Sequence, residues 1–154
     1  MKKFIFISLV ILFLQSCGYS PMYGKNQNVN FYIEKITFNN GDKDLITFIK
    51  SNLNRYLIND NENKFNIFAK INYEKNPLSK NTAGETEEFE LYLEINFEIT
   101  SKQLIKNLKI IEKFKMNNLA DEFEETRYER TIKQNMARLV TAKLINQLTR
   151  FNVN

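Results

Sequence analysis

The stretch EFELYLEINFEIT, residues 88–100, alternates apolar and polar side chains along nearly its whole length. Successive side chains of a β-strand point to opposite faces of a sheet, so the pattern predicts a strand with one buried and one solvated face. Glu90, Glu94 and Glu98 form a row that is expected on the solvated face, with a partner-binding surface as the alternative interpretation. The apolar set comprises Phe89, Leu91, Leu93, Ile95, Phe97 and Ile99.

Three further segments show strand patterns on either side of this one. Residues 31–38 are predicted to form a strand with an irregular end, closed by Asn39-Asn40-Gly41. Residues 65–73 alternate with period two, and residues 108–116 do so after a turn near residues 101–106. Glu112 interrupts the apolar set of the last segment, which predicts a bulge or an edge position there.

Two segments show the helical period instead. Residues 44–58 place their apolar side chains on one face, with Asp42 as the expected N-cap. A long amphipathic helix is predicted near the end of the chain, where Asp121 and Glu124 have the spacing of a capping box. Its apolar stripe is expected to comprise Phe123, Tyr128, Ile132, Met136, Leu139, Val140, Leu144 and Leu148.

Taken in order, the segments predict an α+β fold with the element order β-α-β-β-β-α. Two helices laid across one face of a four-stranded sheet bury both helix stripes and the apolar strand faces together. Residues 31–154 are long enough for a single domain of this kind, and only four glycines and two prolines interrupt the whole chain.

The beginning of the chain has the features of an export signal. Met1-Lys2-Lys3 is positively charged, and residues 4–14 are apolar but too short to span a bilayer as a helix. Leu14-Gln15-Ser16-Cys17 resembles the bacterial lipobox, in which the cysteine receives an S-diacylglycerol group and, after cleavage, an N-acyl group. Residues 1–16 are therefore expected to be a cleaved signal peptide, and residues 17–30 a lipidated tether.

The predicted anchor also bears on location and partners. Several acyl chains on Cys17 would hold the protein on a membrane, and Gly18 stands where an aspartate would favour retention in the inner membrane. An outer-membrane, periplasm-facing protein is expected. Loss of Lys2 and Lys3 lowers the formal charge from +4 to +2 (4 − 2), and the exposed sheet face is acidic, so no nucleic-acid partner is expected.

An enzyme is disfavoured by the residues that the chain lacks. The sequence has no histidine, its one cysteine is assigned to lipid, and no glycine-rich phosphate loop or metal-ligand spacing occurs. The pairs Glu87-Glu88 and Glu124-Glu125 leave carboxylate-based hydrolysis as a minor alternative. No catalytic residue, metal or cofactor is expected beyond the covalent lipid.

Residues 17–24, Cys-Gly-Tyr-Ser-Pro-Met-Tyr-Gly, resemble the opening Cys-Gly-Phe-x-Pro-Leu-Tyr-Gly of the alphaproteobacterial lipopolysaccharide-assembly lipoproteins, the LptE (RlpB) family. The chain departs from that motif by Tyr19 for Phe and Met22 for Leu; its size and element order also agree with the family. The resemblance implies an outer-membrane lipoprotein that plugs the LptD β-barrel, helps it assemble and assists insertion of lipopolysaccharide into the outer leaflet. A generic periplasmic adaptor of another envelope complex is the alternative.

Lipopolysaccharide is an anion, so lysines are its natural contacts. Residues 74–85 are expected to form a loop between the second and third strands, long enough to enter a barrel lumen. This loop supplies Lys75 and Lys80 as candidate lipopolysaccharide-binding residues, and the last strand supplies Lys113 and Lys115 beside Lys109. Isolated surface lysines usually only keep a protein soluble, and this is the alternative interpretation for each of the four.

Overall fold

The structure is a computed structural model that describes residues 31–57, 63–102 and 105–151. The predicted signal peptide, Cys17 and the tether of residues 17–30 lie outside the described residues. The domain boundary at residue 31 therefore stays a prediction.

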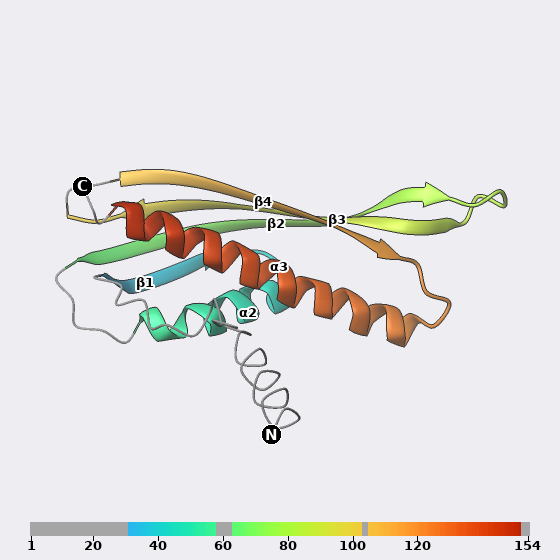
Figure 1. Cartoon of the computed structure of the whole chain (residues 1–154), viewed down its shortest axis with the longest axis horizontal. Helices are drawn as coiled ribbons and strands as arrows, with labels where there is room; N and C mark the ends of the chain where they lie inside the picture. The colour runs from blue at the N-terminus through green and yellow to red at the C-terminus, as the bar shows by residue number, and fades with distance from the viewer. Residues whose placement is uncertain (1–30, 58–62, 103–104, 152–154) are drawn as a thin grey trace, which may run out of the picture.

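The described chain follows the predicted order β-α-β-β-β-α (Figure 1). A short 3₁₀ turn, η2, continues the first helix. The elements are β1 (Tyr32–Asn39), α2 (Lys43–Leu53), η2 (Asn54–Tyr56), β2 (Lys64–Lys80), β3 (Thr86–Thr100), β4 (Ile105–Asn117) and α3 (Glu122–Phe151).

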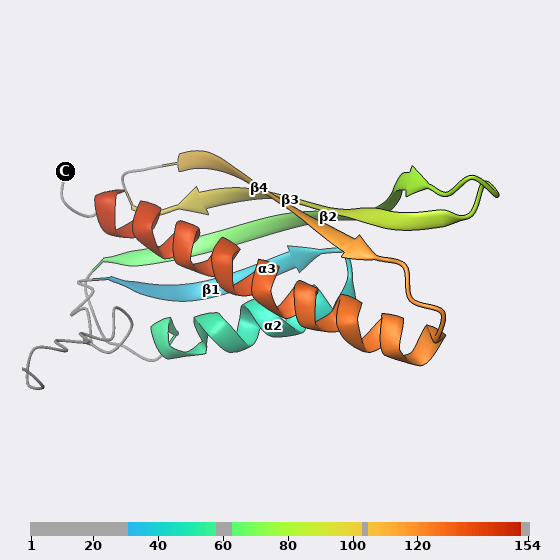
Figure 2. The same ribbon diagram turned by 45° about the vertical axis from the view of Figure 1, so that its right-hand side comes forward.

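The four strands form one sheet in the order β1-β2-β3-β4. β1 runs parallel to β2 and reaches it through α2, whereas β2, β3 and β4 form an antiparallel meander. The pairing of β1 shifts between Ile33 and Lys35, so the irregularity lies in the first half of the strand and not at its predicted end. Both helices lie on one face of the sheet, with α3 running obliquely across it (Figures 1 and 2). The predicted α+β architecture is confirmed.

The core lies between that sheet face and the two helices. The alternate residues of β3 from Leu91 to Ile99 are all buried, as their spacing predicts. Ala69 of β2 and Ile33 of β1 are buried on the same face. From the helices, the core receives Leu45, Ile49, Leu53, Ile132, Met136, Ala137, Val140, Leu144, Ile145 and Leu148.

Three residues of the predicted α3 stripe are exposed, and that part of the prediction is wrong. Phe123 is 68% exposed, because it lies in the first turn of α3, which extends past the N-terminal end of α2 (Figure 1). Tyr128 is also exposed near this end. Leu139 is 38% exposed, because the buried face of α3 is centred on Met136, Val140 and Leu144 at four-residue steps, and Leu139 points away from it.

The predicted helix caps are both present. The carboxylate of Asp42 accepts the backbone N–H of Leu45 at 2.9 Å, and that of Asp121 accepts the N–H of Glu124 at 3.0 Å. The first helix is shorter than the predicted range of 44–58, since α2 gives way to η2 at Asn54. Ile58 lies outside the described residues.

The predicted loop of residues 74–85 is wrong, because most of it is strand. β2 continues to Lys80 and only residues 81–85 form the turn, where Asn81 accepts the N–H groups of Ala83 and Glu85 and Gly84 has a φ of +87°. Pro77 lies within β2 and is accommodated by shifts in the pairing on either side of Ser79.

The extended β2–β3 hairpin forms an arm that projects from the body of the molecule (Figures 1 and 2). β4 ends where Asn117 pairs with Glu88, and β1 ends where Asn39 pairs with Lys70. Residues 79–87 therefore form a two-stranded arm with no neighbouring strand. Lys80 lies on this arm.

Candidate functional site

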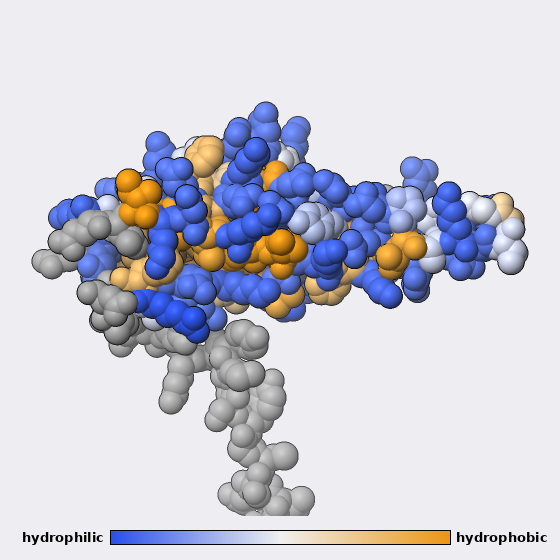
Figure 3. Space-filling view, turned by 90° about the horizontal axis from the view of Figure 1, so that it is seen from above, coloured by the Kyte–Doolittle hydropathy of each residue, from blue (hydrophilic) through white to orange (hydrophobic). Residues whose placement is uncertain are grey.

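The helix-free face of the sheet carries a ladder of paired charges. Lys109 Nζ lies 2.8 Å from Glu94 Oε2, and Lys113 Nζ lies 3.1 Å from Glu90 Oε1. Two of the three predicted glutamates are thus matched by lysines of β4, and this part of the face is not free anionic surface. In the space-filling view, the surface is mainly hydrophilic with separated apolar patches (Figure 3).

Glu94 is the centre of this ladder. Besides Lys109, it accepts the Nδ2–H of Asn96 at 2.9 Å and the hydroxyl of Tyr92 at 2.7 Å. Hydrogen bonds from Lys109, Asn96 and Tyr92 lower the pKa of Glu94 to about 2. The hydrogen bond that Tyr92 donates to Glu94 raises the pKa of the Tyr92 hydroxyl.

A second charge cluster lies on the helix-covered side and joins β2 to α3 and to the N-cap of α2. Lys75 Nζ lies 2.7 Å from Glu125 and 3.2 Å from Glu129, and Lys133 Nζ lies 2.9 Å from Glu129 and 2.8 Å from Asp42. Although burial opposes the shift, hydrogen bonds with Glu125 and Glu129 raise the pKa of Lys75. Likewise, burial alone would raise the pKa of Glu129, but hydrogen bonds from Lys133 and from other donors lower it. We refer to Asp42, Lys75, Glu125, Glu129 and Lys133 as the β2–α3 cluster.

The four lysines predicted to bind lipopolysaccharide do not form one site. Lys75 lies in the β2–α3 cluster, where two carboxylates match its charge. Lys80 lies on the arm, and Lys113 and Lys115 lie on β4. Within the described residues, neither Lys80 nor Lys115 forms an ion pair, so these two are available to an anion.

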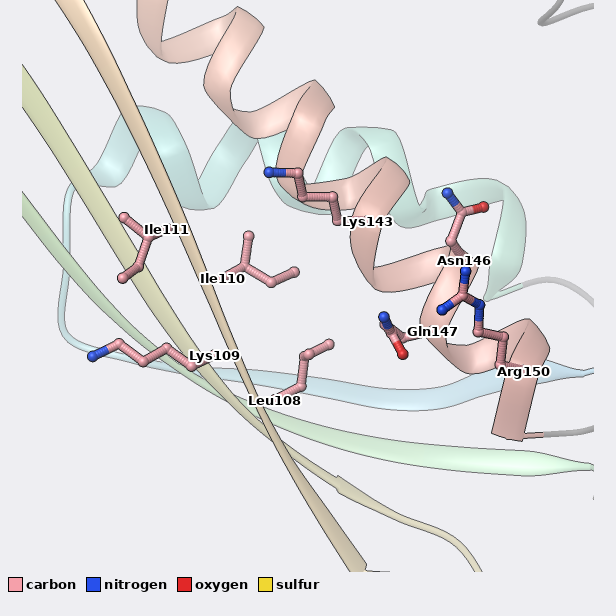
Figure 4. Close-up of a pocket in the computed structure, with 8 residues that line it drawn as sticks. All are labelled: Leu108, Lys109, Ile110, Ile111, Lys143, Asn146, Gln147 and Arg150. Atoms are coloured by element: carbon pink, nitrogen blue, oxygen red, sulfur yellow. The ribbon is translucent and has the colours of Figure 1, made fainter.

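A groove lies between β4 and the C-terminal half of α3 (Figure 4). Its volume is about 300 Å³. Lys143 lies in this groove with its Nζ 2.6 Å from Glu112, the residue that interrupts the apolar set of β4. β4 is an edge strand whose pairing with β3 shows no bulge, so the edge alternative at Glu112 is the correct one. The lining residues are Leu108, Lys109, Ile110, Ile111, Lys143, Asn146, Gln147 and Arg150.

The basic residues Lys143 and Arg150 were missed by the sequence analysis. Together with Gln147 they follow a spacing of four and three residues, which places them on one side of α3. That spacing was a usable signal, but the position of β4 beside it depends on the tertiary fold.

A shallower hollow of about 230 Å³ surrounds Phe68 on the helix-free face. Phe68 is 43% exposed and its Cα pairs across the sheet with that of Glu98. The hollow is also lined by Lys35, Thr37 and Asn66, but the amide of Asn66 already donates to Glu34 at 2.9 Å. The set offers hydrogen bonding and ring contact, without a nucleophile beside a base.

The described residues offer little for catalysis or metal binding. Across residues 31–57, 63–102 and 105–151, no group of three or more acidic or cysteine side chains is placed to hold a metal ion. In the adjacent pairs Glu87-Glu88 and Glu124-Glu125, at least one carboxylate of each already has a partner. Glu88 accepts a hydrogen bond from the Ser79 hydroxyl at 3.4 Å, and Glu124 forms an ion pair with Arg127 at 3.1 Å. None of the described helices is both long and apolar enough to cross a bilayer.

Comparison with solved structures gives several matches to bacterial lipoproteins. Rare lipoprotein B from Shewanella oneidensis is 14% identical, with a TM-score of 0.60 over 78% of this chain and 97% of that one. An uncharacterized lipoprotein B from Nitrosomonas europaea is 15% identical, with a TM-score of 0.60 over 85% and 92%. A minor lipoprotein from Acinetobacter baumannii is 14% identical, with a TM-score of 0.58 over 80% and 93%. A scan against protein-family models gives no match, and neither does a search of curated sequences.

The structure thus defines the class of fold: a four-stranded sheet with two helices on one face, shared with bacterial envelope lipoproteins. More particularly, it is the fold of rare lipoprotein B from Shewanella oneidensis and of the lipoprotein B from Nitrosomonas europaea. The fold implied by the motif is confirmed.

The charge ladder makes a prediction that NMR can check. The Glu94 carboxylate is expected to titrate with a midpoint of about 2, below its ordinary value of 4.5, because three donors bind the charged form. A folded-state pKa below the unfolded value means that Glu94 stabilises the fold above pH 4.5 and loses this contribution as the pH falls towards 2.

Lys109→Met is expected to raise the pKa of Glu94, whereas Lys70→Met, a matched loss of an exposed lysine on β2, should leave it unchanged. Carbon-detected NMR of the side-chain carboxyl measures both. A wild-type Glu94 that titrates near 4.5 would contradict the ladder.

Proposed function

We propose that this chain is an outer-membrane lipoprotein, anchored through lipid on Cys17, that acts as the plug and assembly subunit of a lipopolysaccharide translocon. Its partner is an LptD-type β-barrel, and it has no enzymatic role. The observation that carries the proposal is the match to rare lipoprotein B over 97% of that chain, together with the lipobox and the motif of residues 17–24.

The shape and surface of the described residues suit such a plug. The lumen of a large outer-membrane barrel is polar and hydrated, so a plug needs polar and charged surfaces rather than an apolar one. The charge ladder provides such a surface on the helix-free face. The two-stranded arm of residues 79–87 is narrow, since paired strands lie about 5 Å apart. We infer that the arm can reach into the barrel lumen while the rest of the domain contacts other parts of the barrel.

Site-specific photocrosslinking in cells tests the partner. Azidophenylalanine in place of Thr82, which is exposed in the turn of the arm, is expected to form an adduct with a large outer-membrane β-barrel protein. Azidophenylalanine in place of Phe97, which is 1% exposed in the core, is the control and should form no intermolecular adduct. An adduct from Thr82 to an unrelated complex would favour the alternative of a generic envelope adaptor.

Direct contact with lipopolysaccharide is part of the same proposal. Lys75, Lys80, Lys113 and Lys115 remain candidates, but they differ in how free their charge is. Lys75 and Lys113 are paired with carboxylates, whereas Lys80 and Lys115 have no ion pair among the described residues. Lys80 and Lys115 are therefore the better test positions; Lys75→Glu would place a third carboxylate beside Glu125 and Glu129 and would disturb the fold.

The double substitution Lys80→Glu with Lys115→Glu is expected to weaken binding of purified lipopolysaccharide by about tenfold, since two lysine–phosphate attractions become repulsions. Titration calorimetry in detergent measures the dissociation constant. Lys35→Glu with Lys70→Glu changes the net charge equally on β1 and β2 and serves as the control. Equal weakening by both pairs would mean that binding depends on overall charge and not on these residues.

A further inference from the structure

The outward edge of β4 has no strand beside it among the described residues. β4 pairs only with β3, and the sheet order places it last. Alternate backbone N–H and C=O groups of an edge strand point away from the sheet and are ready to pair with another strand. Over its 13 residues, β4 offers roughly 44 Å of such edge.

Cationic side chains flank this edge on both faces of the sheet. On the helix-free face, β4 carries Lys109, Lys113 and Lys115. The side chains of Lys109 and Lys113 are 53% and 56% exposed, so much of each lies open to a neighbour beyond the edge. On the helix-covered face, Lys143 and Arg150 of α3 line the groove beside β4 (Figure 4).

The same strip offers apolar contact between the charges. Leu108 and Ile110 form the strand side of the groove, whose volume of about 300 Å³ is enough for one or two side chains of a neighbouring strand. On the opposite face, Ile111 is 41% exposed between Lys109 and Lys113. A strand added at this edge would therefore meet apolar as well as basic groups on each face.

Charge disfavours a second copy of this chain as the occupant. If two β4 strands paired antiparallel about Ile111, Lys109 of one would lie opposite Lys113 of the other, and like charges directly opposite each other destabilise a sheet. Residues 18–30 of the chain itself are also disfavoured, because they contain no acidic residue and include Lys25. Lysines commonly protect edge strands against pairing with copies of themselves. Because opposite charges attract, an acidic strand is the favoured neighbour of β4.

The pairing of β3 with β4 shows which side chains a neighbour of β4 can place against it. Between β3 and β4, Glu90 forms a diagonal ion pair with Lys113 and Glu94 one with Lys109, while Leu93 and Ile95 fill the core on the other face. A partner strand with carboxylates towards the lysines would repeat that arrangement on the open side of β4.

We propose that the free edge of β4, together with the groove against α3, is a docking strip for an acidic, extended segment of a partner protein, which adds to the sheet as a fifth strand. Carboxylates of that segment would lie near Lys113 and Lys115 on one face and near Arg150 on the other. The inference goes beyond the proposed function, since it holds for whichever envelope complex the chain serves.

A synthetic peptide tests the strip. The full lipidated chain in detergent micelles is titrated with a short peptide that alternates glutamate with valine, and with the same peptide carrying lysine for glutamate. The expected result is saturable binding of the acidic peptide alone, weakened by salt, with slowed amide hydrogen exchange confined to β4.

Charge-reversal variants locate the contact. Lys115→Glu with Arg150→Glu is expected to weaken the acidic peptide about tenfold or more, and neither residue has an ion pair within the described ranges that its loss would break. Lys35→Glu with Lys70→Glu, on the far strands of the same sheet, should change binding less than about twofold. Circular dichroism checks that both variants are folded.

Four outcomes would overturn the proposal. The lysine peptide could bind equally well, or the acidic peptide could bind without protecting β4 amides. The outward-pointing β4 amides, which do not bond to β3, could already be protected in the chain without peptide, which would mean that its own residues cover the edge. Light scattering could show a dimer whose formation protects β4, which would make a second copy the occupant.

Discussion

The buried row of β3 is the contact on which the rest of the structure depends. Its side chains meet β2 and β4 on either side and both helices above, and each contributes about 1.5–3 kcal/mol by leaving water. Because side chains alternate along a strand, burial of this row forces the glutamates onto the other face, where β4 supplies their lysines. Core and charge ladder are thus two consequences of one alternation. The row comprises Leu91, Leu93, Ile95, Phe97 and Ile99.

The β2–α3 cluster has a different task, because it lies where the core ends. There α3 passes beyond α2, and the ion pairs of Lys75 with Glu125 and Glu129 tie it to β2. Glu129 is the central group: it accepts from Lys75, Lys133 and the Tyr73 hydroxyl. Because Lys133 also reaches the N-cap Asp42, one connected set of charges orients α3, α2 and the base of the arm. The arm itself extends beyond this cluster, where its own strand pairing and two hydrogen bonds from Asn118 to the carbonyls of Thr86 and Glu87 hold it.

Local patterns predicted the elements well and their contacts poorly. The alternation of β3 and the cap at Asp42 were readable, because each depends on a few neighbouring residues, whereas at Glu112 the sequence left a bulge and an edge position open. The loop predicted over residues 74–85 was wrong, because the pairing shifts that accommodate Pro77 in β2 leave no mark in the sequence. The exposure of Phe123 and the pairing of Lys75 with α3 were not predictable either, because both depend on where α3 crosses the sheet. The basic groove combines residues of β4 and α3 and exists only in the folded chain.

The helices cover one face of the described domain, whereas its arm, its charge ladder and the β4 edge are open to contact. We propose that these surfaces serve a lipopolysaccharide translocon. The most direct measurement is purification of the tagged full chain from outer membranes in gentle detergent, with quantitative mass spectrometry of the proteins that accompany it. The account predicts a large LptD-type β-barrel protein at close to one copy per chain. Recovery of the chain alone, or with an unrelated envelope complex, would contradict it.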